Sequence, residues 1–264
     1  MPHEALIRLG VFATLFLLFA AWEALAPRRR SAQPRQGRWM TNWAMLILDA
    51  GALRVLALLI PLLAVGAALD AGRMGWGLFN QLDGPLWLEG LFGILFLDLA
   101  IWTQHLITHR VPLLWRFHRV HHADRDMDVT TAIRFHPVEI AASMLLKIGL
   151  VYAIGPPALA VLIFEVLLNA TSLFNHANIA LPPGIDRWLR LVLVTPDMHR
   201  VHHSADRPEH DSNFGFALSV WDHLFGTYRA QPALGHDGMT VGLDWQDDRP
   251  ARLGWSLTLP FRRR

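Results

Sequence analysis

Long apolar runs constrain the fold of this chain more than any other feature. Three of them, residues 6–26, 43–69 and 86–109, are each long enough to cross the hydrocarbon core of a bilayer as a helix. Hydrophobic residues make up 53% of the 264 residues and charged residues only 17%, a balance outside the usual range of soluble domains. We therefore expect an integral membrane protein.

A further apolar region is interrupted by helix-breaking residues. The runs 138–154 and 158–175 are separated by the sequence Gly-Pro-Pro, in which glycine ends a helix and proline prevents its continuation. This pattern predicts a helical hairpin that enters and leaves the membrane on one side. Residues 182–264 are more polar. The predicted fold is all-α, with three transmembrane helices, the helical hairpin and a cytoplasmic helical cap that carries the histidine motifs.

The distribution of arginines predicts the orientation of these helices. The sequence "PRRRSAQPRQGR" follows the first apolar run, whereas the sequence before that run, "MPHEALIR", holds little positive charge. This asymmetry favours a retained helix with its C-terminal end in the cytoplasm, although "ALA" at 24–26 resembles a signal-peptidase site. The basic character then reflects orientation in a bacterial-type inner membrane and not nucleic-acid binding. All histidine clusters are expected at its cytoplasmic surface.

Histidines are concentrated in a repeated pattern. The sequence "HRVHH" occurs at 118–122 and again at 199–203, and a pair of histidines four residues apart precedes the first copy. Side chains three and four residues apart share one face of a helix, so each cluster presents its imidazoles together. With one more histidine at the end of the hairpin, the candidate metal ligands are His105, His109, His118, His121, His122, His176, His199, His202 and His203.

Nine imidazoles are too many for a single ion. A structural zinc ion takes four protein ligands and a catalytic one about three, so two ions sharing the nine histidines are expected. Neutral imidazole is the commonest nitrogen donor to iron, zinc and copper. Other histidines are interpreted differently: His3 and His210 as solvated or structural, and His136 and His223 as structural or as outer neighbours of the ligands.

Two carboxylates within the apolar runs are expected to support this site. Asp98 lies on the helical stripe that leads to His105 and His109, and Glu165 lies on the stripe that leads to His176. A carboxylate within the membrane is costly and usually has a partner, and carboxylates commonly accept the outer N–H of a metal-bound imidazole. The alternative is that each forms an ordinary polar contact between helices.

These motifs resemble the fatty acid hydroxylase/sterol desaturase superfamily of integral membrane proteins. The resemblance rests on "HLITH", the two copies of "HRVHH", "DSNFG" and "WDHLFGTY", and runs from about Asp98 to Tyr228. It implies two iron ions (Fe2+/Fe3+, with zinc as a possible substitute) held by the nine histidines, O2 as co-substrate, and hydroxylation or desaturation of a lipid. One departure is "HANIA", where some relatives carry a second histidine, so Asn178 is a candidate for a tenth ligand.

The chain holds no recognisable electron carrier of its own. It has no cysteine, no glycine-rich dinucleotide fingerprint and no haem-attachment motif, so an external donor such as a ferredoxin, a cytochrome b5-like protein or a reductase is expected. A zinc-dependent membrane hydrolase acting on a lipid ester or phosphate is the main alternative, and a transport protein is a weaker one. The expected divisions are N-terminal helices at 1–85 with a basic cytoplasmic linker at 28–40, a catalytic domain at 86–230, and a cytoplasmic tail at 231–264.

Overall fold

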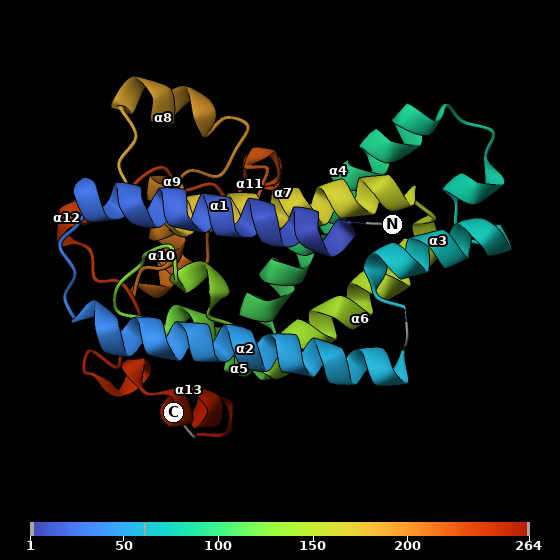
Figure 1. The fold of residues 1–264 in the computed structure, drawn as a ribbon. Helices are drawn as coiled ribbons and strands as arrows, with labels where there is room; N and C mark the ends of the chain where they lie inside the picture. Colours follow the sequence, from blue (N-terminus) through green and yellow to red (C-terminus); the bar gives the residue numbers. More distant parts are fainter. Residues whose placement is uncertain (1–2, 61, 263–264) are drawn as a thin grey trace.

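The computed structural model describes residues 3–60 and 62–262, and within them the chain is almost entirely helical (Figure 1). These residues form no β-strand, only two isolated bridges. The longer helices are α1 (Glu4–Leu25), α2 (Arg35–Leu59), α3 (Ala64–Met74), α4 (Leu86–Arg110), α5 (Pro112–His122), α6 (Pro137–Ile154) and α7 (Ala158–His176). The shorter ones are η1 (Phe79–Gln81), η2 (Thr131–Ile133), α8 (Pro183–Leu189), α9 (Pro196–His202), α10 (Arg207–His210), α11 (Val220–Leu224), α12 (Gly235–Gly238), η3 (Arg249–Ala251), α13 (Leu253–Thr258) and η4 (Leu259–Phe261).

Five segments in the described residues are long and apolar enough to cross a membrane: Glu4–Leu25, Arg35–Gln81, Leu86–Arg110, Pro137–Ile154 and Ala158–His176. Their outward surfaces are apolar, with Leu17 68% and Leu58 83% exposed. Apolar patches of this extent face lipid or a partner. The mainly helical fold expected from the apolar runs is confirmed, and it contains five candidate membrane-spanning segments.

The second apolar run does not form the single helix expected over 43–69. Helix α2 ends at Leu59 and α3 begins at Ala64, while residue 61 of that run lies outside the described residues. The sequence at 61 is proline, which lacks the N–H that an uninterrupted helix would use. Helix α3 is short, and it packs against α6 and α7.

The long helices bring the histidine-bearing segments to one end of the molecule. Helix α7 packs against α1 and α4, and α6 packs against α2 and α3. In Figure 1, α9, α10 and α12 lie at one end of α1 and α2, and α3 lies at the other. Helix α7 also packs against α9, and the last turns of α4 and α7 carry His109 and His176.

Glycine makes the turn between α6 and α7 possible at the opposite end. Gly155 caps α6 with φ +67°, a conformation that side chains with a Cβ rarely adopt. A Cβ at this position would lie 2.7 Å from the carbonyl oxygen of Trp76. Gly155 therefore allows a tight turn between α6 and α7, and this turn contacts the segment that follows α3.

The predicted basic linker at 28–40 is partly helical and firmly held. Helix α2 already begins at Arg35, and the side chain of Arg38 is only 1% exposed. Its guanidinium donates two hydrogen bonds to Asp124, at 2.6 and 2.9 Å, and one to Asp128, at 2.9 Å. Such bidentate pairs are strong and directional. They fix the start of α2 against the loop that follows the first His-x-x-His-His motif.

The end of the chain packs on the protein and is not an extended tail. Trp255 and Leu259 are buried against Trp115 and Val120 of α5. Buried Arg134 connects this region to the loop before α6 by donating to Pro250 O and to the hydroxyl of Ser256, both at 2.8 Å. The C-terminal helices therefore buttress the helix that presents three of the candidate ligands.

Candidate metal centre

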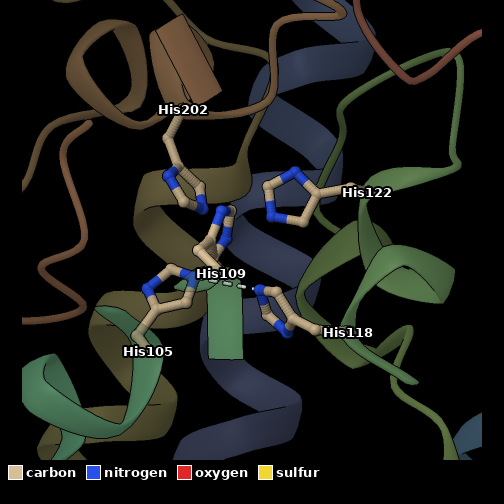
Figure 2. A group of neighbouring side chains, drawn as sticks. All are labelled: His105, His109, His118, His122 and His202. Atoms are coloured by element: carbon tan, nitrogen blue, oxygen red, sulfur yellow. Dashed lines mark hydrogen bonds between the residues drawn. The ribbon is translucent and has the colours of Figure 1, made fainter. Parts of the chain in front are cut away.

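Five of the nine predicted ligands form one buried group, called here the five-histidine group. It consists of His105, His109, His118, His122 and His202, whose ring nitrogens lie within 4.8 Å of one another. Figure 2 shows these rings converging from three segments: two from α4, two from α5 and one from α9. Each side chain is buried.

The remaining four predicted ligands form a second group, the four-histidine group. It consists of His121, His176, His199 and His203, again with ring nitrogens within 4.8 Å of one another. The two groups are neighbours, because the rings of His122 and His203 stack with centroids 4.6 Å apart. The structure thus brings all nine sequence-predicted histidines into two adjacent clusters.

Each His-x-x-His-His motif divides its side chains between the two groups. In the first copy, His118 and His122 enter the five-histidine group, while His121 enters the other. The second copy does the reverse, since His199 and His203 share the four-histidine group. Residues four apart on a helix are nearly in line, whereas the residue at i+3 is rotated to the side, so one motif can serve two sites.

The orientation of the rings fits bound cations. His105 donates from Nδ1 to Phe214 O at 2.7 Å, and the Nδ1 of His118 lies 2.6 Å from a carboxylate oxygen of Glu139. With their protons on Nδ1, both neutral rings carry lone pairs on Nε2, yet these Nε2 atoms face each other at 3.0 Å. Two facing lone pairs repel unless a cation binds both.

The four-histidine group repeats this arrangement. His176 donates from Nδ1 to Ser172 O at 2.7 Å and His121 to Arg134 O at 3.2 Å, while their Nε2 atoms lie 3.1 Å apart. Metal–nitrogen bonds are roughly 2.1 Å, so two donors at a right angle on one ion lie about 3.0 Å apart. The rings of His122 and His203 are buried. Neither ring nitrogen of either residue has a hydrogen-bond partner among the described residues. The donor set therefore fits one metal ion in each group.

Burial keeps the ligands on the connecting segments in their metal-binding form. Burial lowers the pKa of each of these rings well below its usual value, and neighbouring imidazoles lower it further. The rings are those of His121, His122, His199, His202 and His203. A lowered imidazole pKa favours the neutral ring near neutral pH. Only the neutral ring has a free lone pair for a metal ion.

The segment "DSNFG" at 211–215 orients three rings of the five-histidine group. Ser212 O accepts a hydrogen bond from His202 at 2.7 Å and Phe214 O accepts one from His105, while a carboxylate oxygen of Asp211 lies 3.5 Å from Nδ1 of His109. Such outer contacts fix the tautomer and direction of a ligand. The loop thus acts on the ligands mainly through its backbone.

Asp222 holds this loop in place. Its carboxylate accepts hydrogen bonds from the backbone N–H groups of Phe214, at 2.8 Å, and Gly215, at 2.9 Å, and from the indole of Trp102 at 3.0 Å. Burial raises the pKa of Asp222, and these donors lower it. The sequence motif that contains Asp222 was noticed, but its role was not. The sequence feature that could have indicated this role is an acidic residue directly after a large aromatic one, Trp221.

Glu139 was also missed by the sequence interpretation. It lies at the start of α6, and its carboxylate contacts the Nδ1 of His118, as described above. The sequence offered one signal, an acidic residue two positions after the "HP" that starts the hairpin. A carboxylate in this position raises the basicity of a metal ligand.

Asp98 contacts the segment that follows the loop 211–215, and its hydrogen bonds among the described residues do not include one to an imidazole. Its carboxylate accepts a hydrogen bond from the indole of Trp221 at 2.7 Å and a longer one from Leu218 N at 3.4 Å. Trp221 directly precedes Asp222 in α11. Asp98 therefore acts on the site through this segment, and the predicted hydrogen bond to a ligand ring is replaced by one to tryptophan.

Glu165 and Asn178 also have partners of their own. Glu165 pairs with Lys147 at 2.8 Å and with half-buried Arg8, and these ion pairs join α1, α6 and α7. The side-chain amide of Asn178 donates to Arg29 O at 2.8 Å and accepts from Arg29 N at 3.1 Å. These contacts occupy the groups that were predicted to serve the metal site.

The four histidines with predicted minor roles, His3, His136, His210 and His223, lie outside both groups. His136 caps α6 by accepting from Val138 N, and exposed His223 contacts Arg190 O. His210 is buried, stacks on Trp115 with centroids 5.3 Å apart, and donates to Ser204 O. These contacts agree with structural roles.

Comparisons with known proteins point to a single family. Residues 90–227 match the family described as fatty acid hydroxylase. Ornithine lipid hydroxylase OlsE of Rhizobium tropici is 26% identical over 225 residues, which cover 84% of this chain and 67% of that protein. Alkylglycerol monooxygenase of Homo sapiens is 32% identical over 156 residues, which cover 58% of this chain and 33% of that protein. Cholesterol 25-hydroxylase of Rattus norvegicus is 26% identical over 145 residues, or 54% of this chain and 47% of that protein.

The extent of these matches differs between relatives. The chain spans about two thirds of the ornithine lipid hydroxylase, about a third of the alkylglycerol monooxygenase and about half of the cholesterol hydroxylase. No solved structure matches the chain. The matched region holds all nine histidines of the two groups.

Proposed function

Because the chain belongs to the fatty acid hydroxylase family, we propose that it is a membrane-bound, O2-dependent oxidoreductase that hydroxylates an unactivated C–H bond of a lipid. Hydroxylation consumes the lipid, O2, two electrons and two protons, and yields the hydroxylated lipid and water. Desaturation, which begins with the same hydrogen abstraction, is the other reaction that this type of centre could catalyse. The observation that carries the proposal is the pair of adjacent, all-histidine groups with facing ring nitrogens.

The nine histidines would hold two iron ions, one in each group. When bound, iron supplies the redox chemistry that O2 activation requires. The chain itself orients the rings through backbone carbonyls and Glu139, and it surrounds them with aromatic side chains. Phe135 stacks on His121 with centroids 4.4 Å apart, and Phe214 packs on His109 at 5.1 Å. These contacts exclude water from the centre. Asp98, Glu165 and Asn178 are assigned positioning roles and not roles in the chemistry.

Electrons must come from another protein in this proposal. The sequence contains no cysteine and no dinucleotide fingerprint, so it carries neither an iron–sulfur cluster nor a bound nicotinamide of the usual kind. A ferredoxin, a cytochrome b5-like protein or a reductase would dock on the side that holds the histidines. We assign that side to the cytoplasm, because the arginines that follow α1 lie there and basic segments are preferentially kept on the cytoplasmic side of a membrane.

The reaction is tested by anaerobic purification followed by lipid profiling under 18O2. We expect iron near two per chain and a lipid that gains one oxygen-18 atom when the donor is supplied. His121→Ala should abolish the product, whereas His223→Ala, a matched change at an exposed histidine outside both groups, should retain it. Turnover of a lipid ester or phosphate without O2 would instead indicate the hydrolase.

The orientation has a separate test, since the chain lacks cysteine and accepts single labelling sites. Ser31, between α1 and α2, and Asp83, just before α4, are both exposed. In Figure 1 the connection from α1 to α2 and the segment from α3 to α4 lie at opposite ends of the long helices. In intact spheroplasts, a membrane-impermeant maleimide should label Asp83→Cys but should label Ser31→Cys only after lysis. The reverse pattern would place the histidine groups outside the cytoplasm.

A further inference from the structure

A cavity of about 210 Å³ lies beside the four-histidine group and is distinct from it. Its walls come from the segment after α1, the loop after α5, the end of α7, helix α9 and residues 239–246. Arg200 lies between His199 and His202 in α9, and Asn178 lies just beyond His176. None of the nine histidines lines this cavity. It is therefore a second, separate recess on the same side of the molecule.

The charge of the cavity is strongly positive. Among the described lining residues, one carboxylate, that of Asp126, opposes four arginines: Arg29, Arg30, Arg125 and Arg200. The Asp126 carboxylate already accepts hydrogen bonds from the backbone of Ala32, at 2.8 Å, and Gln33, at 3.0 Å. An excess of guanidinium groups in a recess attracts an anion.

Two of the guanidinium groups have hydrogen-bonding capacity that the protein does not use. Arg200 is 1% exposed and its Nη1 pairs with Asp197, but its Nη2 is buried without a partner among residues 3–60 and 62–262. The Nη2 of Arg29 donates to Met239 O at 2.8 Å, while its Nη1 is likewise buried and unpaired. Burial lowers the pKa of Arg200 to about 10 and lowers that of Arg29, against the opposing effect of the nearby aspartates. A buried N–H without an acceptor is costly, and a bound anion would remove that cost.

The size and position of the cavity suit a phosphate group. A cavity of roughly 10–15 Å³ holds a single water molecule. A cavity of about 210 Å³ therefore accommodates a phosphate together with the group that it esterifies. Arginine binds phosphate through paired N–H donors. Helix α1 ends at Leu25 and Arg28 N then donates to Asn178 O at 2.8 Å, so the chain passes from a candidate membrane span directly into this wall. The cavity is therefore near the level at which lipid head groups lie.

We propose that this arginine-lined cavity binds a phosphate group, presented either by an anionic lipid or as free phosphate. The site goes beyond the proposed oxygenase function and does not require it, because no histidine lines the cavity and no metal ion is needed for binding. Arg29 and Arg200 provide the buried donors. Arg30 is exposed at the mouth, and Arg125, which also contacts Gln246, is half-buried.

The test measures binding to the full-length protein in neutral detergent by native mass spectrometry. The probes are phosphatidic acid and diacylglycerol with the same acyl chains, which differ only in the phosphate, and inorganic phosphate as a competitor. We expect phosphatidic acid to bind at least tenfold more tightly than diacylglycerol. Arg29→Gln and Arg30→Gln should each reduce that preference several-fold, and the matched surface change Arg252→Gln should leave it unchanged, because Arg252 pairs with exposed Asp248 elsewhere.

The outcomes separate the two sources of phosphate. If inorganic phosphate binds with the same dependence on Arg29 and Arg30 while phosphatidic acid has no advantage over diacylglycerol, the site binds phosphate from solution. If neither probe responds to these substitutions, the proposal is overturned. Arg30→Gln alters only an exposed side chain, so it remains informative even where Arg29→Gln fails to fold. If the wild-type protein binds phosphate as expected but hydroxylates no lipid, the result counts against the oxygenase proposal alone.

Discussion

The two histidine groups differ in the number of donors and in what holds the rings from outside. The five-histidine group is oriented by a carboxylate on α6 and by the loop 211–215. The four-histidine group is oriented by two backbone carbonyls, those of Ser172 and Arg134, and the Nδ1 atoms of His199 and His203 are buried without partners among the described residues. The first group therefore has more donors and more support, and the second depends on fewer contacts.

This difference predicts unequal tolerance to the loss of one ligand. His203→Ala leaves three donors in its group, whereas His122→Ala leaves four in the other. We expect His203→Ala to lose about one iron per chain and all activity, and His122→Ala to retain more iron under the same chelator challenge. Iron analysis after dialysis measures both. Equal loss from the two variants would show that the groups do not act as separate sites.

Removing the carboxylate partner should weaken only the five-histidine group. Outer hydrogen-bond partners of a metal ligand are typically worth roughly 10–100-fold in metal affinity or activity. Glu139→Gln keeps the size of the side chain but removes the charge that faces His118. We expect activity to fall within that range, with partial loss of one iron. Unchanged metal affinity would show that this contact is incidental.

Loosening the loop should have a smaller and mainly structural effect. Asp222→Asn replaces a carboxylate that accepts from Phe214 N and Gly215 N. Loss of buried hydrogen bonds of this kind costs about 2 kcal/mol. The expected result is a lower unfolding temperature in detergent and weaker metal binding in the five-histidine group. A variant as stable as the wild type would remove Asp222 from the support of the centre.

The smallest effect is expected at Asp98. An asparagine in its place can still accept a hydrogen bond from the indole of Trp221, so Asp98→Asn should change activity less than tenfold. The turnover rate with saturating lipid and donor provides the measurement. A loss of a hundredfold or more, with normal iron content, would mean that Asp98 has a direct part in the reaction.

Helical spacing was sufficient to predict the ligands but not how they are shared. The separations within 105–109, 118–122 and 199–203 place the imidazoles on common faces, and these faces do converge. Spacing along one helix does not reveal that the ligands belong to two groups. The division of His121 from His118 depends on where α5 is placed, since His121 meets His176 of α7 and His122 meets His202 of α9. That placement comes from distant segments, including the buried Arg134 and the C-terminal helices.

The carboxylates show the limit of helical stripes more clearly. Asp98 and Glu165 lie on stripes that lead to ligands, yet one contacts Trp221 and the other contacts Lys147 and Arg8. Their partners come from α11, α6 and α1, whose relative positions no local pattern specifies. Likewise, the basic composition of 28–40 predicted a linker, but the acidic cluster of Asp124 and Asp128 binds Arg38 and holds the start of α2.

Diffraction from crystals of the anaerobically purified protein, recorded at the iron absorption edge, tests the central claim most directly. The account predicts two anomalous peaks, one surrounded by the five rings that include His105 and one by the four that include His176. A single peak, or iron located away from these rings, would contradict it.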